Sequence, residues 1–223
     1  MEISIFPEKF YVFGVNVGKS VVIGWIVTAV VLVLLVLARL YIRHFKERPK
    51  GLQNLLELAV DGVYSFTKSH LGAAADFAAP FTLTFMVYIF SMTFIEIFGI
   101  SPATEDINCT VAIGLCSFLS VNIIGIRQRG LRGRIKGMCN PSPVVLPIKI
   151  LTDCIAPFSM GIRLFANVLV GGVIMSLVYM ACPYVLPAPI SAYFNVLHIG
   201  IQTFVFALLF LTYSGEALEG EGE

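Results

Sequence analysis

Residues 155–181 read IAPFSMGIRLFANVLVGGVIMSLVYMA, a stretch apolar enough to cross a membrane except for the arginine at position 163. No other Asp, Glu, Lys or Arg occurs between Cys154 and Gly215. An arginine at the centre of a bilayer costs about 2.5–3.5 kcal/mol on insertion scales, and it is normally tolerated only beside a counter-charge or a water-filled cavity. Arg163 therefore requires a carboxylate from elsewhere in the chain, an anionic substrate, or an acid on another subunit.

The composition of the whole chain indicates an integral membrane protein. Of the 223 residues, 57% are hydrophobic and 13% are charged, and the mean hydropathy is +0.88. These values lie far from the average of soluble domains. A transmembrane helix needs about 20 apolar residues, so the chain has room for about five or six crossings and none for a separate soluble catalytic domain. We predict a single membrane domain over residues 1–223.

The order of the apolar runs predicts an all-α fold with about five transmembrane helices. The predicted spans are residues 21–42, 81–100, 107–126, 151–181 and 190–213. A proline-rich segment, PYVLPAP, separates the last two spans, which we expect to form a long tilted hairpin. Residues 52–68 carry apolar side chains at helical spacing, with polar side chains opposite. This pattern predicts one amphipathic helix at the membrane surface.

The positive charges predict the orientation of the chain. They cluster at 39–50, around the end of the first predicted span, and at 127–136, after the third. Basic loops stay on the cytoplasmic side of a membrane, while acidic residues have little influence on orientation. We therefore expect an N-terminus outside, an acidic outer turn around SPATED, and a cytoplasmic C-terminus.

Polar residues recur at helical spacing on both arms of the predicted hairpin. On the first arm they are Ser159, Arg163, Asn167 and Gly171, and on the second Ser191, Asn195, His198 and Gln202. Each set lies on one face of its helix, and two facing polar stripes in lipid suggest a hydrated path. Asn167, Asn195 and His198 equally suit a structural role as interhelical hydrogen-bonding groups. A permanent charge such as that of Arg163 is not needed for that purpose.

Two carboxylates outside the polar stripes each allow two interpretations. Glu96 is either a buried partner of Arg163 or, from its position near the end of a span, a group at the outer headgroup level. Asp153 follows Lys149 by four residues, so the two side chains can pair near the cytoplasmic surface. The alternative for Asp153 is a place at the mouth of an ion path.

The residues around Arg163 resemble a known family. The string GIRLFANVLVGGVI is similar to the LRLFGN signature of subunit a of the F-type rotary ATP synthase, with Arg163 on the arginine of that signature. Three further strings support the resemblance, namely PATEDINCT, PIKILTDCIAPFSMGIRLF and IQTFVFALLFLTY. The similarity is collinear from about Phe10 to Gly215, which is nearly the whole chain.

The resemblance implies a stator that holds two ion half-channels against a rotating ring of c subunits. Arg163 would face the ring carboxylate, Asn167 would line the same surface, and Gln202 would lie opposite the arginine. Asn195 would belong to the same path. Relatives often carry an acid or histidine where this chain has Gly172 or Asn195, so His198 is expected to substitute. Further channel-lining candidates are Ser159, Asp153, Glu96, Asn108 and Ser191.

The same resemblance implies the surroundings of the chain. Its partners would be the c-ring, the b subunits of the peripheral stalk, the lipid bilayer and the translocated H⁺ or Na⁺, with no nucleic acid, metal or other cofactor. The chain would have no catalytic site of its own. We expect it in a bacterial plasma membrane.

The main alternative is a stand-alone secondary transporter or channel in which Arg163 binds an anionic substrate. Such proteins often contain internal repeats, and no convincing repeat is seen here. An intramembrane hydrolase is disfavoured because the HExxH and GxSxG motifs are absent. Copurification with ring and stalk subunits distinguishes the stator from both alternatives.

Overall fold

The computed structural model of the protein describes residues 9–12, 15–42, 52–98, 102–138, 146–181 and 187–218. The long helices are α1 (Lys19–Ile42), α2 (Leu52–Leu71), α3 (Ala75–Phe94), α4 (Ile107–Met138), α5 (Leu146–Ala181) and α6 (Pro187–Leu218). Short 3₁₀ helices are η1 (Gly72–Ala74), η2 (Ile95–Phe98) and η3 (Ala103–Glu105). Five described segments are long and apolar enough to cross a membrane, which confirms the predicted all-α membrane fold. One addition is a short antiparallel hairpin of β1 (Lys9–Val12) and β2 (Val15–Gly18).

Lipid explains why these runs are helical, because only a helix satisfies the backbone polar groups of a single apolar segment. Buried hydroxyl groups are likewise hydrogen-bonded within their own helix. Thr82, Thr93 and Ser214 are fully buried, and each donates a hydrogen bond to the carbonyl of the residue four positions earlier. These polar side chains therefore need no partner from another helix.

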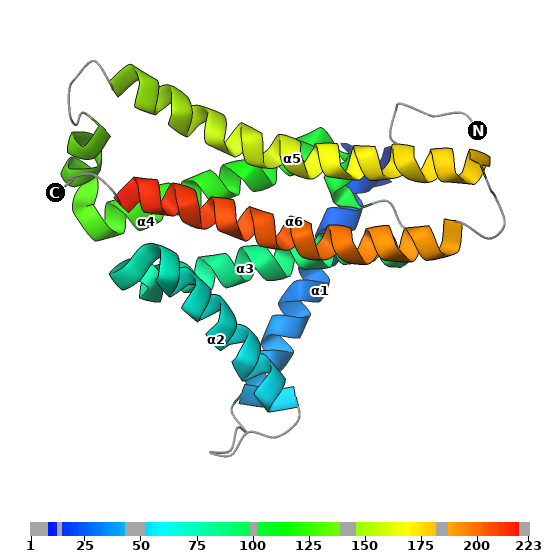
Figure 1. Ribbon diagram of the computed structural model, residues 1–223, viewed down its shortest axis with the longest axis horizontal. Coiled ribbons are helices and arrows are strands. Elements are labelled where there is room, and N and C mark those ends of the chain that lie inside the picture. Colours follow the sequence, from blue (N-terminus) through cyan, green and yellow to red (C-terminus); the bar gives the residue numbers. More distant parts are fainter. Residues whose placement is uncertain are drawn as a thin grey trace.

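Helices α3, α4, α5 and α6 run side by side, whereas α1 and α2 lean away from them and approach each other at the lower edge of Figure 1. Val27 and Val31, in the middle of α1, pack on Met92 of α3 and Ala103 of η3. Most of the large apolar residues of α1 beyond this contact are exposed, as expected for a surface in contact with lipid.

The main core lies among α3, α4, α5 and α6. Its fully enclosed members include Ile89, Ile124, Phe210 and Leu211, each with 0% of its surface exposed. Phe85 of α3 packs on Phe206 and Phe210 of α6, with ring centroids 5.8 and 5.1 Å apart. This core fixes α6 against α3, and α6 also contacts α4 and α5.

Helices α4 and α5 approach most closely at Gly161. A Cβ atom at this position would lie 2.8 Å from the backbone oxygen of Thr110 and 3.1 Å from the Cα of Val111. Only glycine allows the two backbones to come this near. The contact lies two residues before Arg163, so it holds that part of α5 in place.

Most helices extend beyond the predicted spans. The third predicted span, 107–126, continues in α4 to Met138, with a non-helical Gly130 at φ 72° marking a kink. The second, 81–100, begins earlier, at Ala75, and α3 ends at Phe94. The last two spans are also longer, and the surface helix 52–68 extends to Leu71. Hydrophobicity marks the part of a helix that lies in lipid, whereas the helix itself continues until the backbone geometry stops it.

Helix α2 differs in part from the amphipathic pattern. Gln53, expected on the solvated face, is 8% exposed and donates to Glu57 at 2.9 Å. Leu55, expected on the apolar face, is 64% exposed. The end of α2 is fixed to α3 by a 2.6 Å hydrogen bond from the Tyr64 hydroxyl to Asp76.

Candidate functional site

Arg163 lies on an exposed face of α5. A neighbouring face is buried through Met160, Leu164 and Val168, whose spacing of four residues keeps one side of the helix in the core. Arg163 therefore points away from the core. No carboxylate of the described residues forms an ion pair with it.

Asn167 and Gln202 join α5 to α6. The Nδ2 of Asn167 donates to the Oε1 of Gln202 in a short hydrogen bond. Gln202 is 3% exposed, so its amide depends on this partner. The resemblance implied a glutamine opposite the arginine, but Gln202 contacts the residue one turn further along α5.

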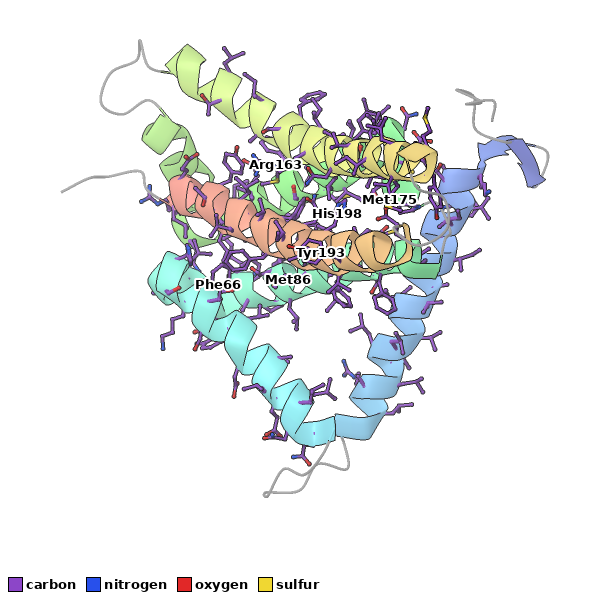
Figure 2. All side chains as sticks on the ribbon, turned by 45° about the vertical axis from the view of Figure 1, so that its right-hand side comes forward. Phe66, Met86, Arg163, Met175, Tyr193 and His198 are labelled. Atoms are coloured by element: carbon purple, nitrogen blue, oxygen red, sulfur yellow. The ribbon has the colours of Figure 1, made fainter. Side chains whose placement is uncertain are left out.

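Gly171 of α5 and His198 of α6 lie one helical turn further along the contact between these two helices, which we call the seam. The Nδ1 atom of His198 lies 3.9 Å from the position that a Cβ of Gly171 would take. Figure 2 shows Arg163 and His198 in the region where α5 and α6 lie side by side. The Nε2 of His198 is buried and has no hydrogen-bond partner among the described residues. Two members of each predicted polar stripe thus face each other.

The remaining stripe residues are placed less fully. Ser159 is half-buried on α5, one turn before Arg163. Asp153 belongs to α5, and Ser191 and Asn195 belong to α6. The structure describes the backbone of these three residues but not their side chains.

Asn108 lies away from the seam. It is exposed at the start of α4, and its backbone amide and Nδ2 donate to Asp106 Oδ1 at 2.9 and 3.1 Å. This arrangement satisfies one of the free amides at the N-terminus of α4. Asn108 therefore has a local capping contact in this structure.

Glu96 lies in η2, just beyond the apolar segment that ends at Phe94. Burial raises the pKa of its carboxyl, and the charge of Glu105 raises it further. Glu96 and Arg163 form no ion pair in the described part of the structure, and the Oε2 of Glu96 has no hydrogen-bond partner there. Thr104 gave no signal in the sequence, because an isolated threonine beside an apolar run does not indicate what it will face.

The site combines a cation without a described partner, a fixed pair of amides and a half-buried imidazole. Such a face can attract an anionic group, and the amides can orient it without changing charge. Within the described ranges, no group of three or more His, Cys, Asp or Glu side chains could hold a metal ion.

Comparison with known proteins identifies similar chains. The family model described as ATP synthase A chain matches residues 21–215. A curated protein named ATP synthase subunit a, from Moorella thermoacetica, is 30% identical over 216 residues, which cover 96% of each chain. Both matches include Arg163 and the whole seam of α5 and α6.

Proposed function

The chain belongs to the ATP synthase A chain family, and from this premise we propose that it forms two ion half-channels against a rotating ring of c subunits. It is a multi-pass membrane protein of that machinery. In the proposed role, each ring subunit brings a carboxylate past Arg163. The translocated ion is H⁺ or Na⁺, and its passage drives rotation of the ring and ATP synthesis.

The observation that carries this proposal is the exposed Arg163 without a carboxylate partner among the described residues. A carboxyl surrounded by lipid keeps its proton or bound ion, because desolvation disfavours the charged form. Beside a permanent cation the ionised form becomes favourable. Arg163 therefore promotes release of the ion from each arriving subunit.

The same charge prevents a direct leak. A cation crossing between the half-channels would have to pass the guanidinium, which repels it. The ion must instead travel with the ring. The hydrogen bond between Asn167 and Gln202 supports this function because it fixes α5 and α6 at a position next to the arginine.

The polar stripes supply the proposed half-channels. On the cytoplasmic side we assign Ser159 and Asp153, and on the outer side Asn195, His198 and Ser191. The assignment follows the positive-inside orientation, with the N-terminus outside and the C-terminus in the cytoplasm. The c-ring and the b subunits of a peripheral stalk are the proposed partners, in a bacterial plasma membrane.

The experiment compares wild type with Arg163→Ala in membrane vesicles, after assembly of the complex has been verified. We expect the variant to lose ATP-driven ion pumping and ATP synthesis. Arg127→Ala removes an exposed arginine from the basic cluster and serves as a matched control that retains both activities. Coupled pumping by the assembled Arg163→Ala complex would refute the proposal.

The alternative of a solitary anion transporter makes a different prediction. It requires anion flux in liposomes that contain this chain alone, and loss of that flux in Arg163→Ala. The stator requires the ring and the stalk for any activity. Reconstitution of the isolated chain therefore separates the two.

A further inference from the structure

Three buried polar atoms lack a hydrogen-bond partner within the part of the chain that the structure describes. They are Glu96 Oε2, Thr104 Oγ1 and His198 Nε2. Thr104 is completely enclosed, with 0% of its surface exposed. Nearly all buried polar groups in proteins are hydrogen-bonded, if not to protein then to internal water. These atoms are therefore polar groups whose hydrogen bonding the described protein atoms leave unsatisfied.

Glu96 and Thr104 belong to the same turn. Glu96 lies in η2 and Thr104 in η3, the two short helices between α3 and α4. The charge of Glu105, the residue after Thr104, acts on the Glu96 carboxyl. The turn is packed into the protein, since η3 contacts α1, α4 and α5 while η2 contacts α6.

The register of α3 and α6 brings this turn to the level of His198. Phe85 packs on Phe206 and Phe210, and a Cβ at Gly215 of α6 would lie 3.8 Å from the side chain of Leu71, which ends α2 just before α3, so α3 and α6 are antiparallel. Glu96 follows Phe85 by 96 − 85 = 11 residues. Counting back 11 from 208, the midpoint of Phe206 and Phe210, gives about residue 197 of α6.

The hairpin of α5 and α6 supplies no carboxylate for the proposed outer half-channel. Between Cys154 and Gly215 there is no Asp or Glu, and His198 is the one histidine. A group that exchanges cations rapidly with water, and that also holds them inside the protein, is most simply a partly buried carboxyl. Glu96 is such a group, at the level of His198 but from a different element.

We propose that Glu96 is the ion-transferring carboxyl of the outer half-channel, passing cations between the outer solution and the seam of α5 and α6. Thr104 holds water beside it, and His198 is the next polar group toward Asn167 and Gln202. The inference rests on the proposed function. It assigns the outer titratable group to the turn between α3 and α4, outside the hairpin that carries Arg163.

The test measures passive ion conduction through the membrane sector in vesicles, after the soluble catalytic sector has been removed. Glu96→Gln preserves the size of the side chain and removes the carboxylate, whereas Glu96→Asp preserves the acid. We expect Glu96→Gln to lower conduction about tenfold or more, and Glu96→Asp to restore most of it. The matched control, Glu216→Gln, changes an exposed carboxylate at the far end of α6 and should conduct like wild type.

A second measurement tests access to water. In a variant whose native cysteines have been replaced, Glu96→Cys should react with a membrane-impermeant maleimide added on the outer side. A carboxylate with a merely structural role would be protected from the reagent. If Glu96→Gln fails to assemble, this measurement decides, and absence of labelling from the outer side overturns the inference.

The outcomes separate the inference from its premise. Wild-type conduction by an assembled Glu96→Gln complex overturns the role of Glu96. If Arg163→Ala, measured in parallel, loses coupled pumping at the same time, the proposed function stands and only the inference fails. If Arg163→Ala keeps coupled pumping, the proposed function itself has failed.

Discussion

A methyl group added at Gly161 tests how α4 and α5 hold Arg163 in place. In Gly161→Ala, the new Cβ would lie 2.8 Å from the backbone oxygen of Thr110 and 3.1 Å from its carbonyl carbon. Neither contact can be relieved by rotation of a side chain, because both atoms belong to the backbone. The helices must therefore separate by several tenths of an ångström, or the contact must remain strained.

The magnitude follows from comparison with a second glycine on the same helix. A Cβ at Gly172 would meet no atom within 4 Å. Alanine is favoured over glycine in a helix by about 0.8–1 kcal/mol in water, and whatever this gain is in lipid, both variants receive it. Overpacking a close contact costs about 1–3 kcal/mol. The two variants should therefore differ by about 1–3 kcal/mol, with Gly161→Ala the less stable.

The assay is the midpoint temperature at which the detergent-solubilised complex loses this subunit, compared for wild type, Gly161→Ala and Gly172→Ala. ATP-driven pumping is measured on the same preparations. We expect Gly161→Ala to lower both the midpoint and the coupling, since a displacement of about 1 Å near a reacting group can cost about a hundredfold in rate. Equal midpoints for the two glycine variants would refute the close approach of α4 and α5.

Three further predictions concern packing, hydrogen bonding and pH. Phe210→Ala should destabilise the complex by about 3–5 kcal/mol in the same thermal assay, because the ring is fully enclosed. The control is Phe158→Ala, which should cost less than about 1 kcal/mol because 52% of Phe158 is exposed. Similar losses of stability in the two variants would contradict the assigned core. Asn167→Ala should cost about 1 kcal/mol by leaving the buried amide of Gln202 without its partner, and a double-mutant cycle with Gln202→Ala that shows no coupling would exclude the bond. Burial and the charge of Glu105 raise the pKa of Glu96, so the folded state binds its proton more tightly than the unfolded state, and the stability of wild type falls as pH rises through that raised pKa. Glu96→Gln cannot ionise, so its midpoint temperature should rise relative to that of wild type as the pH increases from the ordinary range of a glutamate carboxyl through the raised pKa, and a pH-independent difference would rule out a carboxyl whose pKa is raised in the folded state.

The sequence predicted the class of fold because lipid leaves few choices. A run of about 20 apolar residues in a membrane must be helical, so the apolar runs were sufficient to predict five crossings. Helix ends were less predictable. Hydropathy did not indicate that α3 begins at Ala75 or that α4 continues past Gly130.

The spacing of polar residues predicted which side chains share a face, but the register between helices did not follow from it. The fixed period of a helix places Arg163 and Asn167 on one face, and His198 and Gln202 on another. Which residues meet depends on the tilt and translation of two whole helices, and these are set by packing throughout the core. Gln202 accordingly forms its hydrogen bond with Asn167, whereas the resemblance implied only that it lies opposite the arginine.

By itself, the sequence determined the membrane class, the family resemblance and the isolation of Arg163, since these depend on composition and local order. Tertiary structure decided the contact of Gly161 with Thr110 and the burial of the Glu96 Oε2 without a described hydrogen-bond partner. Glycine, threonine and glutamate have no fixed meaning in an apolar chain. Their roles depend on which backbone or side chain from a distant segment is packed against them, and only the three-dimensional arrangement of the helices specifies that.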